Sequence, residues 1–165
     1  METIVTSLDK RIENIISLLP RNGDFKKRSI DQITHISVHH SASPMGKFNA
    51  YDFARWHIDP NGRLKAPAIC YHFGIEPDGT IQQTNTLDQI AWHTIGANTV
   101  SIGIELNGNF EVEEPTQEQL DSLFWLIDYL KKDVLKKDLI VKPHKDFKGN
   151  ATACCGKNLI NKLNK

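Results

Sequence analysis

The sequence predicts an α/β fold in which a central mixed β-sheet is flanked by helices. Segments with alternating apolar residues are interleaved with segments of helical spacing, without strict β–α–β regularity. With 39% hydrophobic and 24% charged residues, the composition is typical of a globular protein. The 165 residues contain no internal repeat. We therefore expect a single domain over residues 1–165, with an N-terminal helix and connector in 1–30 and the core of the domain in 31–165.

The first third of the chain predicts a helix, a strand and a second helix. Apolar residues recur at helical spacing over residues 7–19, and Pro20 follows as a stop signal. The β-branched, alternating segment 33–40 ends in turn residues, which indicates a strand. Residues 49–57 have helical spacing and place Trp56 on the expected buried side of that helix.

The rest of the chain predicts a hairpin followed by alternating strands and helices. Residues 69–75 and 80–84 form two strands joined by a turn at Pro77, Asp78 and Gly79. Thr116 and Gln119 have the spacing of a capping box at the start of a long helix. The remaining predicted elements are a strand at 101–106, a helix at 116–133, a strand at 139–141 and a helix at 157–163.

Charge and hydropathy exclude several classes of function. The 20 Lys and Arg residues balance the 20 Asp and Glu residues, so no basic surface indicates a nucleic acid or an anionic membrane as partner. No apolar segment approaches the roughly 20 residues that span a bilayer. Residues 1–10 lack the basic start and apolar segment of a secretory signal, so we expect synthesis in the cytoplasm. The oligomeric state does not follow from these features.

Histidine and cysteine residues supply the candidate chemistry. Histidines stand at the ends of three predicted segments, as His39 and His40, His72, and His144, and Cys154 follows the last across a polar loop. Two imidazoles and one thiolate are good zinc ligands, and three protein ligands leave a fourth position open for water. The sequence therefore indicates a zinc site built from distant parts of the chain.

Five blocks of sequence resemble one enzyme family. The chain is similar to the zinc-dependent N-acetylmuramoyl-L-alanine amidases, which include phage endolysins, bacterial autolysins, cytosolic muropeptide amidases and animal peptidoglycan recognition proteins. The blocks follow the order of that family over about residues 33–160. They are Val38–Ala42, Tyr71–Phe73 with Asp78–Ile81, Ala91–His93, Ser101–Leu106, and His144–Asp146 with Ala151–Gly156.

The resemblance implies a zinc ion held by His39, His144 and Cys154, at the floor of a cleft on the mixed sheet of this family. Two alternatives accompany this ligand set. His40 adjoins His39, although it shares a strand face with apolar residues and His39 shares the more polar face. Cys155 stands where many family members have proline, so it is a second candidate for the thiolate.

The resemblance also implies catalytic and substrate-binding residues. Glu105 shares the polar face of its strand with Ser101 and Gly103 and is the candidate for proton transfer, with a solvent-facing carboxylate as the alternative. Tyr71 is a hydrogen-bond donor toward the reacting carbonyl or a core aromatic, and Thr152 is an oxyanion contact or a loop cap. The residues expected to contact the substrate are Trp92, His93 and His72, with a structural hydrogen bond as the alternative for His93.

We therefore expect a zinc amidase that cleaves the bond between N-acetylmuramic acid and L-alanine in peptidoglycan, as a phage endolysin or an autolysin. Such an enzyme acts on the cell wall after release from the cytoplasm, through a holin if it is an endolysin. The alternatives are a non-catalytic peptidoglycan-binding protein of the same fold, a cytosolic muropeptide-recycling amidase, and a zinc hydrolase of another amide. Its expected partner is peptidoglycan or a muropeptide.

Overall fold

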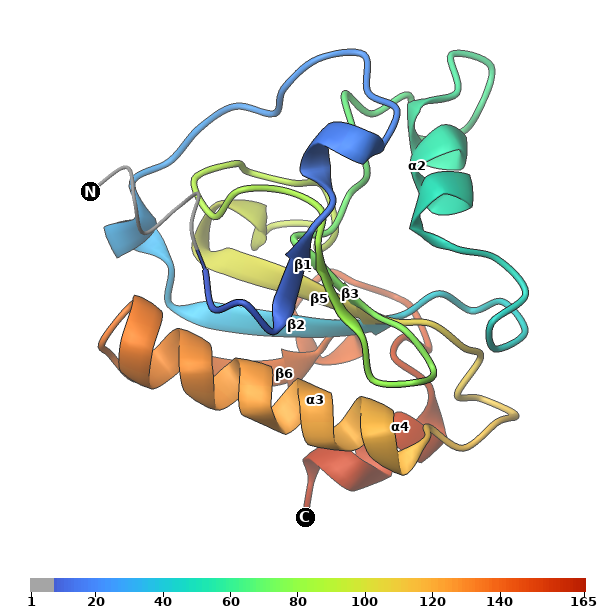
Figure 1. Cartoon of the computed structure of the whole chain (residues 1–165), viewed down its shortest axis with the longest axis vertical. Helices are drawn as coiled ribbons and strands as arrows, with labels where there is room; N and C mark the ends of the chain where they lie inside the picture. Colours follow the sequence, from blue (N-terminus) through green and yellow to red (C-terminus); the bar gives the residue numbers. More distant parts are fainter. Residues whose placement is uncertain (1–7) are drawn as a thin grey trace.

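The computed structural model describes residues 8–165 and shows a six-stranded mixed sheet with helices on both sides (Figure 1). This confirms the predicted fold class. The strands are β1 (Ile12–Asn14), β2 (His35–His40), β3 (Phe73–Ile75), β4 (Ile81–Gln83), β5 (Ser101–Leu106) and β6 (Ile140–Pro143). The helices are α2 (Ala50–Ile58), α3 (Gln117–Tyr129) and α4 (Lys157–Leu163).

The strand order in the sheet is β1-β4-β3-β5-β2-β6. Strands β3, β5, β2 and β6 are parallel, whereas β4 pairs antiparallel with β3 through the predicted hairpin and β1 pairs parallel with β4. The parallel pairs join segments that are distant in the chain, so the carboxyl ends of β2 and β6 meet at one edge of the sheet. No helix within residues 8–165 is long and apolar enough to cross a membrane.

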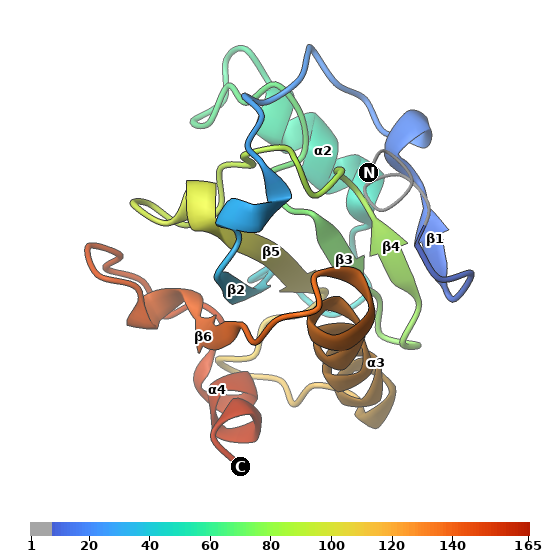
Figure 2. The ribbon, with the colours of Figure 1, turned by 90° about the vertical axis from the view of Figure 1, so that its left-hand side faces the viewer.

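The two faces of the sheet differ in chemistry because side chains alternate along each strand. One face carries the apolar residues of β2 and β5 and packs against α3, which lies below the sheet in Figure 2. The opposite face carries Ser37 and His39 from β2 and Gly103 and Glu105 from β5. The main core on the α3 side includes Ile36, Val38, Phe73, Ile102, Ile104, Leu106, Leu123, Leu126 and Leu130, each fully buried.

A row of polar residues crosses the second face. The strand register pairs His39 with Glu105, Glu105 with Gly74, Gly74 with Gln82, and Gln82 with Glu13. No atom lies within 4 Å of the position that a Cβ would take at Gly74, so this glycine leaves space beside the Glu105 carboxyl. The fold therefore places one carboxyl group directly beside the end of β2.

The helix predicted over residues 116–133 is confirmed as α3. The Thr116 side chain accepts a hydrogen bond from the Gln119 N–H, and the Gln119 side chain accepts one from the Thr116 N–H, so both partners of the predicted capping box are present. Such a cap stabilises a helix by about 1 kcal/mol. After Tyr129 the chain continues as a π-helical turn over Leu130–Val134.

Helix α2 is also confirmed, but the predicted burial of Trp56 is wrong. Asn49 caps the helix, and Phe53 and Ala54 face its apolar side. Trp56 is 48% exposed: its ring meets those of Phe48 and Phe53 edge-on, and the residue lines the cleft described below.

The helix predicted over residues 7–19 is wrong as well. Ser7 lies outside the described residues. The segment instead forms strand β1 and a 3₁₀ turn over Ile16–Leu18. Ile12 pairs with Ile81 at the edge of the sheet, and the Ile15 N–H donates to the Gln83 carbonyl. Edge pairing thus satisfies backbone groups that a short isolated helix would leave to water, and β-branched isoleucines suit it.

Candidate functional site

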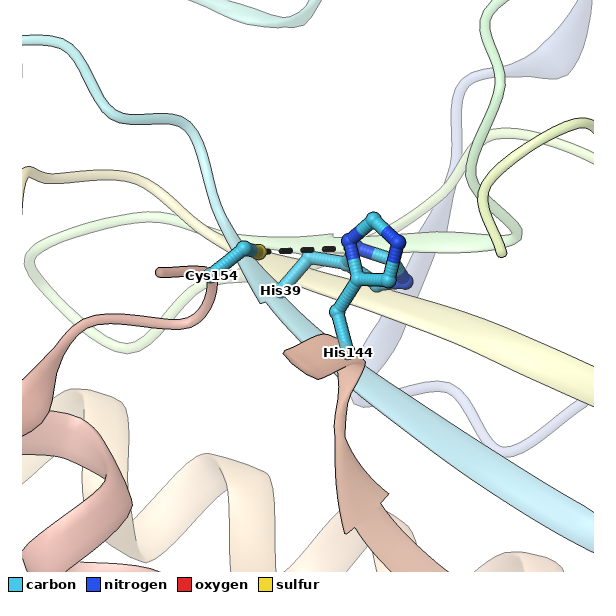
Figure 3. Close-up of side chains that lie close together, drawn as sticks. All are labelled: His39, His144 and Cys154. Carbon is cyan, nitrogen blue, oxygen red and sulfur yellow. Dashed lines mark hydrogen bonds between the residues drawn. The ribbon is translucent and has the colours of Figure 1, made fainter. Parts of the chain in front are cut away.

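Three side chains of metal-binding type converge at the carboxyl edge of the parallel strands (Figure 3). His39 comes from the end of β2, His144 directly follows β6, and Cys154 lies in the loop before α4. One ligand atom from each lies within 4.8 Å of the other two. This spacing allows a single ion to contact all three.

Hydrogen bonds orient the two imidazoles. The Cys154 Sγ lies 3.6 Å from His39 Nδ1, so this nitrogen faces the centre of the group. His144 Nε2 lies 2.8 Å from Asn150 Oδ1. Because the Asn150 amide nitrogen donates to the Ile95 carbonyl, its oxygen is the acceptor for His144, whose Nδ1 then keeps a free lone pair.

The donor set fits zinc. Two imidazoles and one thiolate match the ligands that zinc prefers, and three ligands leave an open position for a water molecule. Burial first, and the neighbouring histidines second, hold the pKa of His39 well below its usual value, so its ring is neutral. Burial raises the pKa of Cys154 to about 12, and an adjacent cation is what would favour its thiolate. The His40 N–H, 3.4 Å from the sulfur, adds a donor toward it.

The two alternative ligands lie elsewhere. The His40 ring is on the opposite strand face, where its Nδ1 accepts a hydrogen bond from the Phe110 N–H at 3.1 Å. Cys155 is fully buried in the main core on the α3 side. Neither side chain belongs to the group formed by His39, His144 and Cys154.

Glu105 and Tyr71 lie next to this group. Glu105 is the direct cross-strand neighbour of His39 and is only 6% exposed. Burial, reinforced by the Glu76 carboxylate, raises the pKa of Glu105 to about 8, and a hydrogen bond from Tyr71 partly opposes that rise. The Tyr71 ring centroid lies 5.0 Å from that of His39. A carboxyl group that can hold a proton at neutral pH therefore stands beside the candidate metal ligands.

A cleft of about 890 Å³ reaches the group at His144, which is part of its lining. Trp92, which is 47% exposed, lines it together with Trp56 and His57 of α2. Thr152 is exposed on the same lining, and its Oγ1 accepts a hydrogen bond from the Cys154 N–H at 3.2 Å, which leaves its own proton free to donate. The cleft, which His144 also lines, thus gives a bound molecule access to the metal-binding group.

Comparisons with known proteins decide the family. The family model described as N-acetylmuramoyl-L-alanine amidase matches residues 29–157. The chain belongs to this amidase family. The amino-acid sequence has no significant match among curated proteins.

Solved structures share the fold of this amidase-family chain. It resembles the endolysin N-acetylmuramoyl-L-alanine amidase LysCS from Clostridium intestinale, with 27% identity, a TM-score of 0.74, and coverage of 96% of this chain and 98% of that one. It resembles bumblebee PGRP-SA, with 22% identity, a TM-score of 0.80 and 93% coverage of both chains. It also resembles peptidoglycan recognition protein LE in complex with tracheal cytotoxin, with 22% identity, a TM-score of 0.78, and coverage of 94% and 93%.

Within this amidase fold, two of the residues expected to contact substrate are buried. His72 is fully buried, its Nδ1 accepts from the Gly103 N–H, and its Nε2 donates to the Gln89 carbonyl. Both nitrogens are thus occupied by the main chain, and the structure does not bring this side chain to the cleft surface. His93 is 7% exposed and belongs to the lining of the cleft, and its Nδ1 lies 3.2 Å from His39 Nε2.

Sequence reasoning missed several residues that shape the site. The Arg28 guanidinium is 6% exposed and donates to the carbonyls of Leu87, Asn98, Thr99 and Ser101, so it anchors the loop that carries Trp92 and His93. Asn150, which holds His144, lies in a polar loop without a distinctive motif. The alternation of side chains along β2 does place Ser37 on the same face as His39, and this was the one sequence signal for a polar residue beside the site.

His57 was also missed, and it predicts acid sensitivity of the fold. Its Nδ1 accepts a hydrogen bond from the Cys70 N–H, and burial lowers its pKa from 6.5 to about 4. Between these values the unfolded chain binds the proton and the native state does not, so stability falls as pH drops below 6.5. Between pH 7 and pH 5, His57 is expected to lower the free energy of unfolding by about 2 kcal/mol.

Denaturant unfolding of wild type and His57→Asn at both pH values tests this expectation. The asparagine oxygen keeps an acceptor for Cys70 but does not titrate. The variant is therefore expected to lose less stability on acidification than wild type by that amount. An equal loss in both proteins would show that His57 does not contribute.

Proposed function

We propose that the protein hydrolyses the amide bond between N-acetylmuramic acid and the L-alanine of the peptidoglycan stem peptide. The observation that carries the proposal is the convergence of His39, His144 and Cys154, with the Glu105 carboxyl beside His39 on the same sheet face and His144 in the lining of a cleft. Membership in the amidase family supports the bond type.

We propose that His39, His144 and Cys154 hold a zinc ion as the cofactor. Bound at such a site, zinc lowers the pKa of a water ligand to about 7 and polarises a carbonyl group. Asn150 orients His144 for this role, and the His40 N–H stabilises the sulfur of Cys154. The chain thus supplies the three ligands together with the hydrogen bonds that direct them.

The remaining steps of amide hydrolysis fall to residues of the chain. We propose that Glu105 accepts a proton from the attacking water and returns it to the leaving amine, and its raised pKa supports both directions near neutral pH. We propose Tyr71 and Thr152 as hydrogen-bond donors toward the oxygen that becomes negative in the transition state. Thr152 lines the cleft with its hydroxyl proton free, and Tyr71 would turn its hydroxyl from Glu105 to that oxygen.

We propose peptidoglycan or a muropeptide as the occupant of the cleft. The exposed indole rings of Trp56 and Trp92 offer flat apolar surfaces beside the polar floor. The complex of recognition protein LE with tracheal cytotoxin, a monomeric diaminopimelic acid-type peptidoglycan, supports this class of ligand for the fold. Similarity to the LysCS endolysin supports a biological role in cell-wall lysis.

The recognition proteins among the similar structures also favour a second candidate, a peptidoglycan-binding protein without activity. The complete metal-binding group and the buried carboxyl beside it weigh against that candidate, because binding alone requires neither.

Analysis of metal content and reaction products tests the proposal. Purified protein is expected to hold about one zinc ion per chain and to release free amino groups from peptidoglycan without new reducing ends. Removal of the metal by a chelator should abolish the release, and added zinc should restore it. Zinc-loaded protein that generates only reducing ends, or no product, would contradict the amidase assignment.

A further inference from the structure

His39 has a second nitrogen that faces a buried polar cluster away from the metal-binding group. Its Nε2 lies 3.0 Å from Ser37 Oγ, 3.3 Å from Thr94 Oγ1 and 3.2 Å from His93 Nδ1. Ser37 and Thr94 are 2.7 Å apart, and Thr94 lies 2.9 Å from His93 Nδ1. All four side chains are at least nine-tenths buried.

These distances allow a directed chain of hydrogen bonds. When His39 Nδ1 binds a metal, Nε2 must carry the proton. His39 then donates to Ser37, Ser37 to Thr94, and Thr94 to His93 Nδ1, and the His93 proton is on Nε2. The two hydroxyls each accept one proton and donate one, while His39 only donates and His93 only accepts, so all three links of the chain are made.

The same atoms allow the reverse direction. His93 Nδ1–H then donates to Thr94, Thr94 to Ser37, and Ser37 to His39 Nε2, which leaves the His39 proton on Nδ1. The proton count is the same in both directions, one on each imidazole and one on each hydroxyl. In the reverse direction His39 has no lone pair to offer a metal.

At the far end of the hydrogen-bond chain, no contact beyond the chain fixes the tautomer of His93. His93 Nε2 is buried and has no hydrogen-bond partner within the described residues. The ring centroid of His72 lies 5.6 Å from that of His93, and main-chain groups fix the tautomer of His72 by bonding both of its nitrogens. Asn150 fixes the tautomer of His144. The tautomer of His93 therefore depends only on the direction of the hydrogen-bond chain.

We propose that Ser37, Thr94 and His93 form a reversible hydrogen-bond chain whose direction metal binding at His39 selects, with the two hydroxyls as positioning residues for the His39 ligand. This proposal rests on the metal site of the proposed function, and it does not depend on the amide substrate. Gly103 is part of the arrangement, because a Cβ there would lie 2.7 Å from His93 Cγ and displace its ring.

Nitrogen-15 NMR of histidine-labelled protein tests the direction. In the zinc-loaded protein, His93 is expected to show an unprotonated Nδ1 and a protonated Nε2, while the shifts of His39 and His144 report metal binding. A zinc-loaded protein with the His93 proton on Nδ1 would overturn the proposal and leave the metal site intact. If zinc leaves His39 and His144 unchanged, the metal site itself fails, and this proposal fails with it.

Zinc affinity, measured by competition with a chelator, tests the positioning role without any substrate. The double variant Ser37→Ala/Thr94→Val is expected to bind zinc 10- to 100-fold more weakly, the usual effect of removing partners of a ligating histidine. Thr94→Ser restores a hydroxyl at the same place and is expected to bind within about threefold of wild type.

The matched control is Ser101→Ala/Thr84→Val. Both residues are buried, and their hydroxyls donate at 2.6 Å to the carbonyls of Ala97 and Tyr71, outside the chain of four groups. The control is expected to keep wild-type zinc affinity even where it loses stability. Equal affinities in the two double variants, or no recovery in Thr94→Ser, would overturn the positioning role.

Discussion

Replacing Cys154 with serine is expected to reduce zinc affinity by more than a hundredfold and to abolish hydrolysis. The substitution removes one of three ligands, so its effect should exceed the 10- to 100-fold loss that follows from removing an outer hydrogen-bond partner. A serine hydroxyl is a poor substitute because it stays protonated, whereas a thiolate is a strong zinc ligand. Metal analysis after dialysis, together with the assay of released amino groups, measures both effects.

Cys155→Ser is the matched control, because the two cysteines are adjacent. Cys155 is fully buried in the apolar core, so the new hydroxyl is expected to cost about 1–3 kcal/mol of stability. Its zinc content should remain near wild type. Loss of zinc in Cys155→Ser with retention in Cys154→Ser would reverse the assignment of the ligand.

Replacing Glu105 with glutamine is expected to lower kcat by 10²- to 10⁴-fold, the usual contribution of general acid–base catalysis. Glutamine has the shape of the carboxyl group and no charge, and burial already favours the neutral form of Glu105. The fold, the zinc content and the affinity for muropeptide are therefore expected to stay close to wild type. Steady-state kinetics and calorimetric titration of the variant with muropeptide separate these quantities.

Glu113→Gln serves as the control for this change. Glu113 accepts hydrogen bonds from the main chain at Met45 and Asn109, and it does not line the cleft. Its kcat should stay within a few-fold of wild type. Near wild-type turnover in Glu105→Gln would show that Glu105 is not the proton carrier. Loss of zinc in that variant would show that Glu105 contributes to the metal site.

Elements with strong local signals were predicted well from the sequence. The boundaries of β5 and α4 agree with prediction, and the capping box at Thr116 marks the start of α3. The segment 8–19 was predicted as a helix because, over so short a length, its isoleucines fit the spacing of a helix as well as that of a strand. Pairing with β4 makes part of it strand β1. That partner is more than 60 positions away in the chain, so no local pattern reports it.

The site was predictable to the extent that residue types and family resemblance carry it. Residue types alone indicated histidines at three segment ends together with Cys154, and the family resemblance selected His39, His144 and Cys154. The structure brings these three together. The hydrogen-bond partners of the two imidazoles were not predictable, because Thr94 and Asn150 are ordinary loop residues whose role depends on tertiary contact. The burial of His93 likewise follows from its packing on Gly103, which only the register of the sheet creates.

The parallel pairing of β5, β2 and β6 has a consequence for how the protein folds. His39 and Cys154 are 115 positions apart, and His144 reaches them only after β6 has joined β2. Such non-local pairings form slowly, because the entropy of closing long loops opposes each one until the contacts exist. The three candidate ligands therefore come together only late in folding, after the parallel strands have paired. In the proposed zinc form the ion would enter a finished sheet, and by binding only the native state it would make unfolding less favourable once assembly is complete.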